Sequence, residues 1–245
     1  MTTWTELEES VKTGRVSKAI LPIGSYEQHG PHLPLSTDTM IAEYVANKVS
    51  EKCETSFLLP SIQVGCSSEH LGFAGTISLT QKTMAGLIVD IAHSLTLTGF
   101  RRLFIINGHG GNKATIDSTL IEVKQLVPDL SIYSFTILDI VKEKFDHIRK
   151  SERGVVGHAD EIETSMMLTI APDCVNMSRA VCEKSLLPEK LSFESNNMTR
   201  ISFAWKASEV TKSGVIGDPA SATAETGTIL LDFAIQVISD IINEL

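Results

Sequence analysis

One short segment of the chain concentrates side chains that can bind divalent metal ions. Within twelve positions it holds two carboxylates and two imidazoles, those of Glu27, His29, His32 and Asp38. Glu27 and His29 are two positions apart, so in an extended backbone their side chains point to the same side. A carboxylate presented together with an imidazole suits a borderline ion such as Zn²⁺ or Mn²⁺. We interpret the segment as part of a metal site; the alternative is a polar loop with unrelated charges.

A glycine-rich turn supplies a further imidazole. His109 has Gly108 before it and Gly110 and Gly111 after it, so the backbone and the imidazole can approach a ligand closely. A phosphate-binding turn is the competing interpretation, because such a turn exposes N–H groups at a helix N-terminus. The spacing matches neither of the common glycine-rich nucleotide motifs. We therefore favour His109 as a metal ligand.

A third candidate segment opens a predicted helix. His158 and Glu161 are three positions apart and can share one helical face, whereas Glu163 points about 200° round from Glu161. One of the two carboxylates can therefore join a metal site while the other makes a structural or supporting bond. The alternative is an ordinary first helical turn, where the helix dipole favours acidic side chains.

Predicted strands and helices alternate along the chain and position these segments. Strands are expected over 18–24, 103–106 and 131–138, and Pro22 indicates an edge or terminal position for the first. Helices are expected over 39–51, 80–97, 114–126, 160–170 and 222–245. This order predicts an α/β layered sandwich with a largely parallel sheet. Such sheets bind ligands beyond the carboxyl ends of their strands, where the first two segments lie.

The composition excludes several classes of partner. The 245 residues include 21 Lys and Arg against 30 Asp and Glu, a net charge of −9, without a basic cluster. Nucleic acids and anionic membranes need a positive footprint, so neither is an expected partner. No apolar run reaches about 20 residues, no signal peptide is expected, and the four cysteines form no C-x-x-C pair. We expect a cytoplasmic protein with one domain over 1–245, and a surface excursion or lid over 180–217.

Five segments, in the same order, resemble the creatininase (creatinine amidohydrolase) family. They lie at 24–35, 65–79, 107–112, 158–165 and 214–227, and the third has the G-H-G-G-N form of one subgroup. The resemblance implies a metal-dependent amidohydrolase with a three-layer α/β/α sandwich, assembled as a homohexamer. It also implies a small-molecule substrate and two divalent ions per subunit, for which Zn²⁺, Mn²⁺ and Fe²⁺ all suit the mixed N/O ligands.

The same resemblance assigns metal ligands by position. Glu27, Asp38 and His109 would hold one ion. His29, Asp38 and a further carboxylate would hold the second, so that Asp38 bridges the pair. In creatininase proper a G-H-x-E-N motif supplies that carboxylate, and the matching position here is Gly111. Relatives with the G-H-G-G-N form use the glutamate of H-A-x-E instead, which falls on Glu161.

Hydrolysis is the chemistry expected of this constellation. Two dications that share a water lower its pKa from 15.7 toward about 7 and so provide hydroxide at neutral pH. That hydroxide would attack an amide or amidine-like carbon, with Glu161 as a ligand and His158 carrying a proton to the leaving nitrogen. Five further residues are expected to contact the substrate: His32, Glu69, His70, Gly110 and Gly111.

Creatinine is not the expected substrate. Gly157 stands where creatininase has a glutamate before the histidine, so part of that machinery is absent. A formamidopyrimidine-nucleotide deformylase and a peptide hydrolase of cofactor maturation are alternatives within the family. Two alternatives come from other classes, a non-catalytic metal-binding module and a metal-dependent phosphoesterase. Release of ammonia, formate or amine from amides, against phosphate from esters, would separate these classes.

Overall fold

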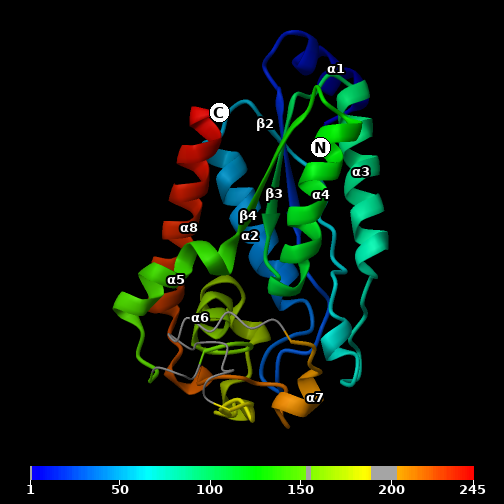
Figure 1. Cartoon of the computed structure of the whole chain (residues 1–245). Coiled ribbons are helices and arrows are strands. Elements are labelled where there is room, and N and C mark those ends of the chain that lie inside the picture. Colours follow the sequence, from blue (N-terminus) through cyan, green and yellow to red (C-terminus); the bar gives the residue numbers. More distant parts are fainter. Residues whose placement is uncertain (1, 153–155, 189–202) are drawn as a thin grey trace.

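A four-stranded parallel sheet forms the centre of the molecule (Figure 1). The computed structural model describes residues 2–152, 156–188 and 203–245. The strands are β1 (Lys18–Ile23), β2 (Ser56–Leu58), β3 (Arg102–Asn107) and β4 (Ser131–Thr136). Their order is β2-β1-β3-β4, and each neighbouring pair is parallel. The carboxyl ends therefore meet at one edge of the sheet.

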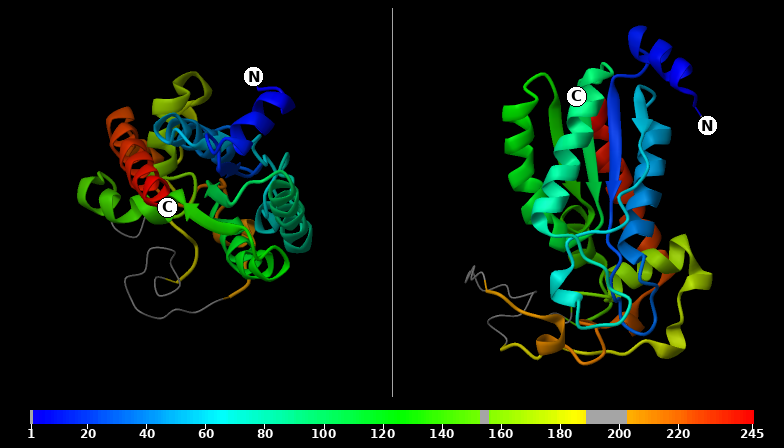
Figure 2. Two further views of the ribbon diagram at one scale, coloured as in Figure 1. Left: turned by 90° about the horizontal axis from the view of Figure 1, so that it is seen from above. Right: turned by 90° about the vertical axis from the view of Figure 1, so that its right-hand side faces the viewer.

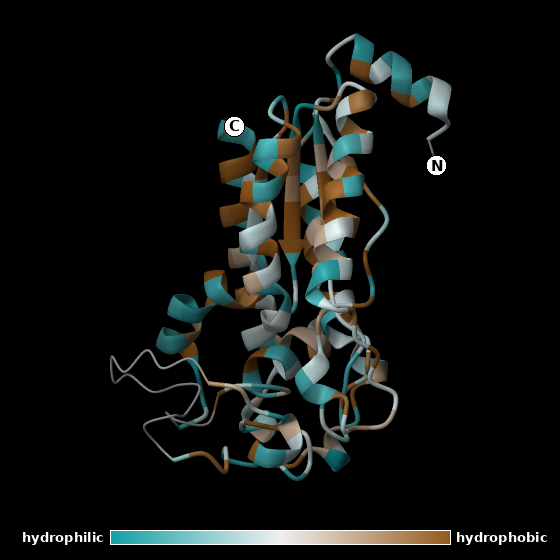
Figure 3. Ribbon diagram, turned by 45° about the vertical axis from the view of Figure 1, so that its right-hand side comes forward, coloured by the Kyte–Doolittle hydropathy of each residue, from teal (hydrophilic) through white to brown (hydrophobic). Residues whose placement is uncertain are grey.

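Helices cover both faces of this sheet, as Figure 2 shows. They are α1 (Trp4–Lys12), α2 (Thr37–Lys52), α3 (Gln81–Leu97), α4 (Lys113–Leu126), α5 (Ile137–Ile148), α6 (Glu161–Ile170), α7 (Ala207–Val210) and α8 (Ala224–Glu244). Ile20 and Phe104 pack in one core with side chains of α2, α5, α6 and α8. Leu21 and Leu103 point the other way and pack with α3 and α4. The apolar strands lie between these layers (Figure 3), which confirms the predicted α/β/α sandwich.

Pro22 was predicted to mark an edge or a terminal position, and it lies near the end of an inner strand, so the edge alternative is wrong. It is in register with Ile106 of β3. Its carbonyl accepts a hydrogen bond from the Ile62 N–H (2.9 Å) on the opposite side, so its ring nitrogen faces that side as well. There β2 has already ended, at Leu58. Proline is tolerated because no strand hydrogen bond is required at that position.

Four of these strands and helices were not expected from the sequence, namely α1, α5, α7 and β2. The strand expected over 131–138 ends at Thr136, and the apolar residues after it belong to α5. Ile137, Val141 and Phe145 are the buried residues of α5, at the four-residue spacing of a helical face. A short polar interval between strand and helix would have marked the boundary, and the chain has none there.

The predicted excursion over 180–217 is described only in part, because 189–202 lies outside the described residues. Its described flanks meet in an antiparallel bridge between Glu183 and Gly217. The short helix α7 lies beside residues 68–70, at the end of the molecule where the strands end (Figure 1). Among the described helices, none has both the length and the hydropathy of a membrane-spanning segment.

Candidate metal centre

The carboxyl ends of β1 and β3 bring the first two predicted segments together. After β1 the chain forms an irregular loop and enters α2, whose first turn carries Asp38. After β3 it turns at Gly108, where a Cβ atom would overlap the carbonyl oxygen of Asp38. Glycine permits this close approach of two backbones. As a result, His109 lies against the start of α2.

Four of the predicted ligands form one buried cluster. Glu27, His29, Asp38 and His109 are each at most 5% exposed. The carboxylate of Asp38 lies between two imidazoles, 3.1 Å from His29 Nε2 and 2.9 Å from His109 Nδ1. Glu27 Oε2 lies 3.2 Å from His109 Nε2. The sequence segments therefore converge as expected for these four residues.

The fifth member of the cluster is Glu163, and the expectation that Glu161 fills this place is wrong in geometry. Glu163 Oε2 lies 3.8 Å from His29 Nε2 and accepts a hydrogen bond from the Ala159 N–H (2.6 Å). The Glu161 carboxylate points elsewhere and accepts the N–H groups of Lys150 (2.9 Å) and Ser151 (2.8 Å). The two side chains diverge because they are about 200° apart around the helix. Glu161 therefore holds the backbone after α5.

Backbone carbonyls orient the imidazoles of the cluster. Three ring nitrogens each lie within hydrogen-bond distance of a carbonyl oxygen: His29 Nδ1 of Glu27 (3.1 Å), His109 Nε2 of Cys66 (2.9 Å) and His158 Nε2 of Gln28 (2.8 Å). A carbonyl only accepts, so each of these nitrogens is the protonated one. In the neutral ring the second nitrogen is then free to accept a proton or bind a metal ion.

Charges within the cluster depend strongly on one another. Burial raises the pKa of Glu27 to about 7, although His109 acts in the opposite direction. Burial by itself would lower the pKa of His29, but the neighbouring carboxylates, Asp38 first and then Glu163 and Glu27, outweigh it and raise the pKa to about 10. For Asp38, burial is likewise outweighed by the neighbouring imidazoles, which hold its pKa well below the usual value. The carboxylates therefore stabilise positive charge at the centre of the cluster.

The residues fit divalent cations. Both carboxylate oxygens of Glu27 are buried, and neither has a hydrogen-bond partner among the described residues. Leaving a buried oxygen without a hydrogen bond costs about 1–3 kcal/mol, and more when the group is charged. A coordinated cation would remove this cost. Three groups of side chains each offer ligand atoms that lie within 4.8 Å of one another. Two of the groups share Asp38, namely Glu27, Asp38 and His109, and His29, Asp38 and Glu163; the third is Glu27, His29 and His158. Carboxylate and imidazole donors of this kind suit Zn²⁺, Mn²⁺ or Fe²⁺.

A row of aromatic rings leads away from this cluster. The His158 ring lies 4.4 Å from that of His29 and 4.5 Å from that of His70, measured between centroids. Trp205 then meets His70 edge-on at 6.0 Å. His158 Nδ1 lies 3.8 Å from Glu27 Oε1, so its unprotonated nitrogen faces the cluster. Trp205 belongs to the described part of the predicted excursion over 180–217, and its position next to His70 was not expected.

The other predicted contact residues have different positions. His70 borders the cluster, with Nε2 3.5 Å from Glu27 Oε1 and Nδ1 accepting from the Gln28 side chain (2.9 Å). His32 is buried and its Nε2 bonds to the Thr164 hydroxyl (2.9 Å), so it packs on α6. Gln28 was not predicted to belong to the site. Its position in the chain between Glu27 and His29, two predicted ligands, was a signal that it lies beside them.

Glu69 and Gly111 lie beside His109. A Cβ atom at Gly111 would lie 2.5 Å from His109 Nε2 and 2.9 Å from Glu69 Oε1. No atom lies within 4 Å of a Cβ built at Gly110. A side chain at position 111 would thus press on His109, whereas position 110 is open.

Comparison with known proteins places this geometry in context. The family described as creatininase, creatinine amidohydrolase, matches residues 1–242. The chain is 32% identical over 217 residues to the mycofactocin precursor peptide peptidase of Mycolicibacterium smegmatis, with 86% of this chain and 78% of that protein covered. It is 28% identical over 256 residues to the creatinine amidohydrolase of Pseudomonas putida, covering 99% and 94%. A solved structure of creatininase with Mn superposes with a TM-score of 0.82 at 28% identity, covering 99% and 96%.

Proposed function

The chain belongs to the creatininase family of metal-dependent hydrolases acting on amide C–N bonds, and from this premise we propose that it hydrolyses a small or non-peptide amide other than creatinine. The observation that carries the proposal is the pair of buried oxygens of Glu27, which accept no hydrogen bond from the described residues and lie next to the His109 and His70 imidazoles. They lie beside two imidazoles and two further carboxylates in one cluster. Creatinine is not favoured because Gly111 and Gly157 stand where the resemblance places glutamates in creatininase.

The ligand set that we propose replaces Glu161 by Glu163. One ion would be held by Glu27, Asp38 and His109, and the other by His29, Asp38 and Glu163. Two ions per subunit, of zinc, manganese or iron, are supported by the shared Asp38 and by the mixed donors. When bound, such ions lower the pKa of water and polarise the carbonyl oxygen of the substrate.

His158 is the residue that we propose for proton transfer. Its Nε2–H is held by the Gln28 carbonyl, so Nδ1 is the basic nitrogen, and it faces the cluster. Burial, and then the charge of His29, lower the pKa of His158 to about 4, which keeps the ring neutral at pH 7. A neutral imidazole can accept a proton at Nδ1 and return it to the leaving nitrogen. A positioned group of this kind contributes about 10²- to 10⁴-fold in rate.

Metal analysis and a product screen test the proposal together. The purified protein should contain close to two equivalents of metal per subunit and release ammonia, formate or amine from some small amide. Phosphate release from esters instead would support the phosphoesterase alternative. Bound metal without turnover of either class would support a binding module.

A peptide-derived amide is a second candidate substrate. The identity to the mycofactocin precursor peptide peptidase, 32%, exceeds the 28% to the creatinine amidohydrolase. A formylated nucleotide is the third candidate substrate, because the G-H-G-G-N motif of this chain resembles the subgroup of the family that includes the deformylases. Mass spectrometry of a short peptide, a formyl amide and creatinine after incubation would rank the three.

We also propose that the chain is a single domain that assembles as a homohexamer. Support for one domain comes from α8, at the end of the chain, which packs on α2 and α5. Support for assembly comes from exposed apolar side chains at one end of the molecule, Trp4 (76%) and Leu97 (74%). They border a groove of about 590 Å³ between α1 and α3. Light scattering coupled to gel filtration would give the mass, and a monomer would contradict the proposal.

A further inference from the structure

Two buried imidazoles, those of His70 and His158, face the same oxygen of Glu27. His70 Nε2 lies 3.5 Å and His158 Nδ1 lies 3.8 Å from Glu27 Oε1. That oxygen accepts no hydrogen bond from the described residues. A neutral imidazole carries one N–H and one bare nitrogen, so the tautomer decides whether each ring offers this oxygen a donor or an acceptor. The contacts on the far side of each ring therefore determine what faces Glu27.

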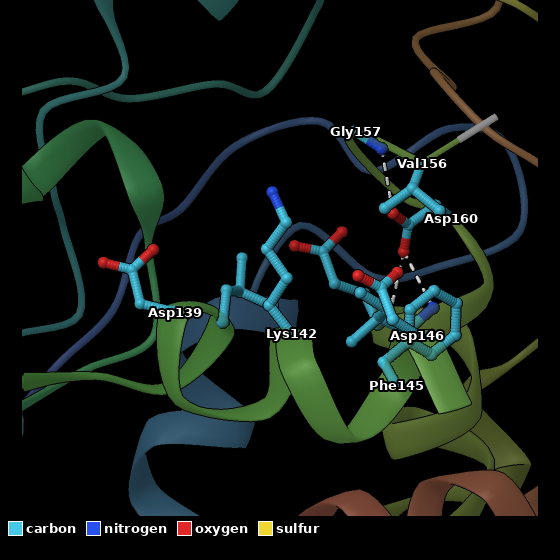
Figure 4. Close-up of a pocket in the computed structure, with 10 residues that line it drawn as sticks. Asp139, Lys142, Phe145, Asp146, Val156, Gly157 and Asp160 are labelled. Carbon is cyan, nitrogen blue, oxygen red and sulfur yellow. Dashed lines mark hydrogen bonds between the residues drawn. The ribbon is translucent and has the colours of Figure 1, made fainter. Parts of the chain in front are cut away.

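Backbone groups fix the tautomer and the place of His158. Its Nε2 lies 2.8 Å from the Gln28 carbonyl, which only accepts, so Nδ1 is the bare nitrogen. The turn that carries the ring is held by the Asp160 carboxylate, which accepts the N–H groups of Gly157 (2.9 Å) and Ile162 (2.8 Å). Figure 4 shows this turn at the border of a cavity of about 170 Å³. His158 therefore turns an acceptor toward the cluster, whatever side chain stands at position 28.

His70 depends instead on one side chain, that of Gln28. The orientation of the Gln28 amide is unambiguous, because its Oε1 accepts the Gly30 N–H (2.9 Å) and its Nε2 donates to the Gly214 carbonyl (3.0 Å). The remaining hydrogen of Nε2 is available to His70 Nδ1, 2.9 Å away. Nδ1 must accept there, so the neutral ring carries its proton on Nε2. His70 therefore turns an N–H, and not a bare nitrogen, toward the cluster.

We propose that Gln28 is a positioning residue for the proposed metal ligand Glu27 and that it acts through His70. The Nε2–H that Gln28 fixes donates to Glu27 Oε1 and so holds the carboxylate with Oε2 on the side of His109, 3.2 Å from its Nε2. The donor and Oε1 need to approach by only a few tenths of an ångström for an ordinary hydrogen bond. Partners of this kind orient the ligands of metal sites. The inference rests on the proposed function, because that function gives Glu27 a cation to hold.

The same arrangement keeps His70 out of the set of metal ligands. Its Nδ1 is occupied by the Gln28 amide and its Nε2 carries the proton, so neither nitrogen has a free lone pair for a metal ion. His158 differs, since its bare Nδ1 faces the cluster and it belongs to a group of possible ligands with Glu27 and His29. One glutamine thus gives two neighbouring imidazoles different roles, a donor and an acceptor.

The tautomer can be read directly in the metal-free protein. Magic-angle-spinning NMR with isotope-labelled histidine distinguishes a bare Nδ1 from a bare Nε2, and the spectrum of His70→Gln identifies the His70 signals. The wild type should show His70 as the Nε2–H form alone. Gln28→Met, of nearly the same length, removes the donor and should add forms protonated at Nδ1. The matched control is Gln236→Met on α8, where an exposed glutamine donates to Asp240, and it should leave the His70 signals unchanged.

Zinc affinity tests the link to Glu27 and needs no substrate. The Kd of Zn²⁺ is measured by competition with a chelating dye. His70→Leu should weaken binding by about 10- to 100-fold and Gln28→Met by about tenfold, as expected when the partner of a metal ligand is lost or misplaced. His70→Gln again presents an N–H near the place of Nε2 and should recover most of the affinity. Because Gln28 acts through the ring, adding Gln28→Met to His70→Leu should change the Kd less than about twofold.

Two results would overturn the proposal: a wild-type His70 with its proton on Nδ1, or losses of zinc affinity that multiply when Gln28→Met and His70→Leu are combined. Should Gln28→Met fail to fold, the wild-type tautomer and the comparison of His70→Gln with His70→Leu still decide. A wild type without zinc affinity would refute the metal centre and the role of Gln28 together. Absence of amide hydrolysis with normal zinc affinity would contradict only the proposed function.

Discussion

At the residue scale, two glutamates of one helical turn have opposite surroundings. Glu161 accepts two backbone N–H groups after α5, and Glu163 faces His29 and the buried cluster. Both carboxylates are buried, so each needs partners, but the partners differ in kind. Backbone donors make Glu161 structural, whereas the imidazole and carboxylate around Glu163 make it available to a cation.

Paired substitutions separate these two roles. Glu163→Gln should lose about one metal equivalent per subunit and lower kcat by at least about 100-fold, since a ligand is removed. Glu161→Gln should retain the metal and instead lower the free energy of unfolding by about 1–3 kcal/mol, because a charged acceptor is lost. Elemental analysis and urea denaturation of both variants provide the measurements. Full metal content in Glu163→Gln would exclude it as a ligand.

His158 should be required for turnover and dispensable for metal binding. His158→Ala removes the basic nitrogen that faces Glu27 but none of the five proposed ligands. We expect two metal equivalents with kcat reduced by about 10²- to 10⁴-fold. Loss of metal in this variant would mean that His158 is a ligand and that another group moves the proton.

The buried imidazole of His32 predicts a pH dependence of stability. Burial, and then the charge of His29, lower the pKa of His32 to about 4. The unfolded chain binds a proton near the ordinary value of about 6.5, so below that pH the unfolded state binds more protons and stability falls. The loss from this group between pH 7 and pH 5 is about 2 kcal/mol. Urea denaturation of the metal-free protein at both pH values should show it, and His32→Gln should show a smaller difference.

At the element scale, the loop of residues 211–214, within the described part of the predicted excursion over 180–217, supports the site. The Glu183 carboxylate accepts hydrogen bonds from the Thr211 hydroxyl (2.9 Å) and from the N–H groups of Lys212 (2.7 Å) and Ser213 (2.8 Å). The next carbonyl, of Gly214, accepts from the Gln28 amide (3.0 Å). The same amide donates to His70. The loop therefore fixes the His70 ring, which packs beside the His158 ring at a tilt of 33°.

Glycine at position 214 should be essential to this support. Gly214 has φ +88°, and a Cβ atom there would overlap the Gln28 side chain. Gly214→Ala should lower the free energy of unfolding by about 1–3 kcal/mol and displace Gln28 from His70. The control is Gly86→Ala within α3, where the new methyl group meets open space and should stabilise the helix by about 1 kcal/mol. Denaturation curves that coincide for Gly214→Ala and wild type would contradict the assignment.

At the scale of the whole molecule, metal binding should be coupled to folding. The ligands come from three parts of the chain that meet only in the native fold, so the unfolded chain offers no comparable site. A ligand at 100 times its Kd stabilises a protein by about 2.7 kcal/mol. Removal of metal with EDTA should therefore lower Tm by at least about 5 °C. Added Zn²⁺ or Mn²⁺ should restore Tm in the wild type, with a smaller recovery in Glu163→Gln.

Much of the layered fold could be predicted from local patterns. The apolar run 103–106 and the helical spacing over 80–97 match β3 and α3 closely. The failures have physical causes in the third dimension. Pro22 left an edge and a terminal position open because nothing local indicates where the neighbouring strand β2 ends. The helix α5 was missed because its apolar face continues directly from the apolar residues of β4.

The sequence by itself determined which kinds of side chain the site would contain and that the chain is an α/β sandwich of the creatininase family. Helical periodicity also predicted that the Glu161 and Glu163 side chains diverge, and the family resemblance assigned Glu161 to the metal. Only the tertiary structure places Glu163, and not Glu161, beside His29, since periodicity relates residues to each other and not to what lies opposite them. The buried oxygens of Glu27, which accept no hydrogen bond from the described residues, likewise emerged only from the fold, because burial and hydrogen bonding depend on contacts between distant segments.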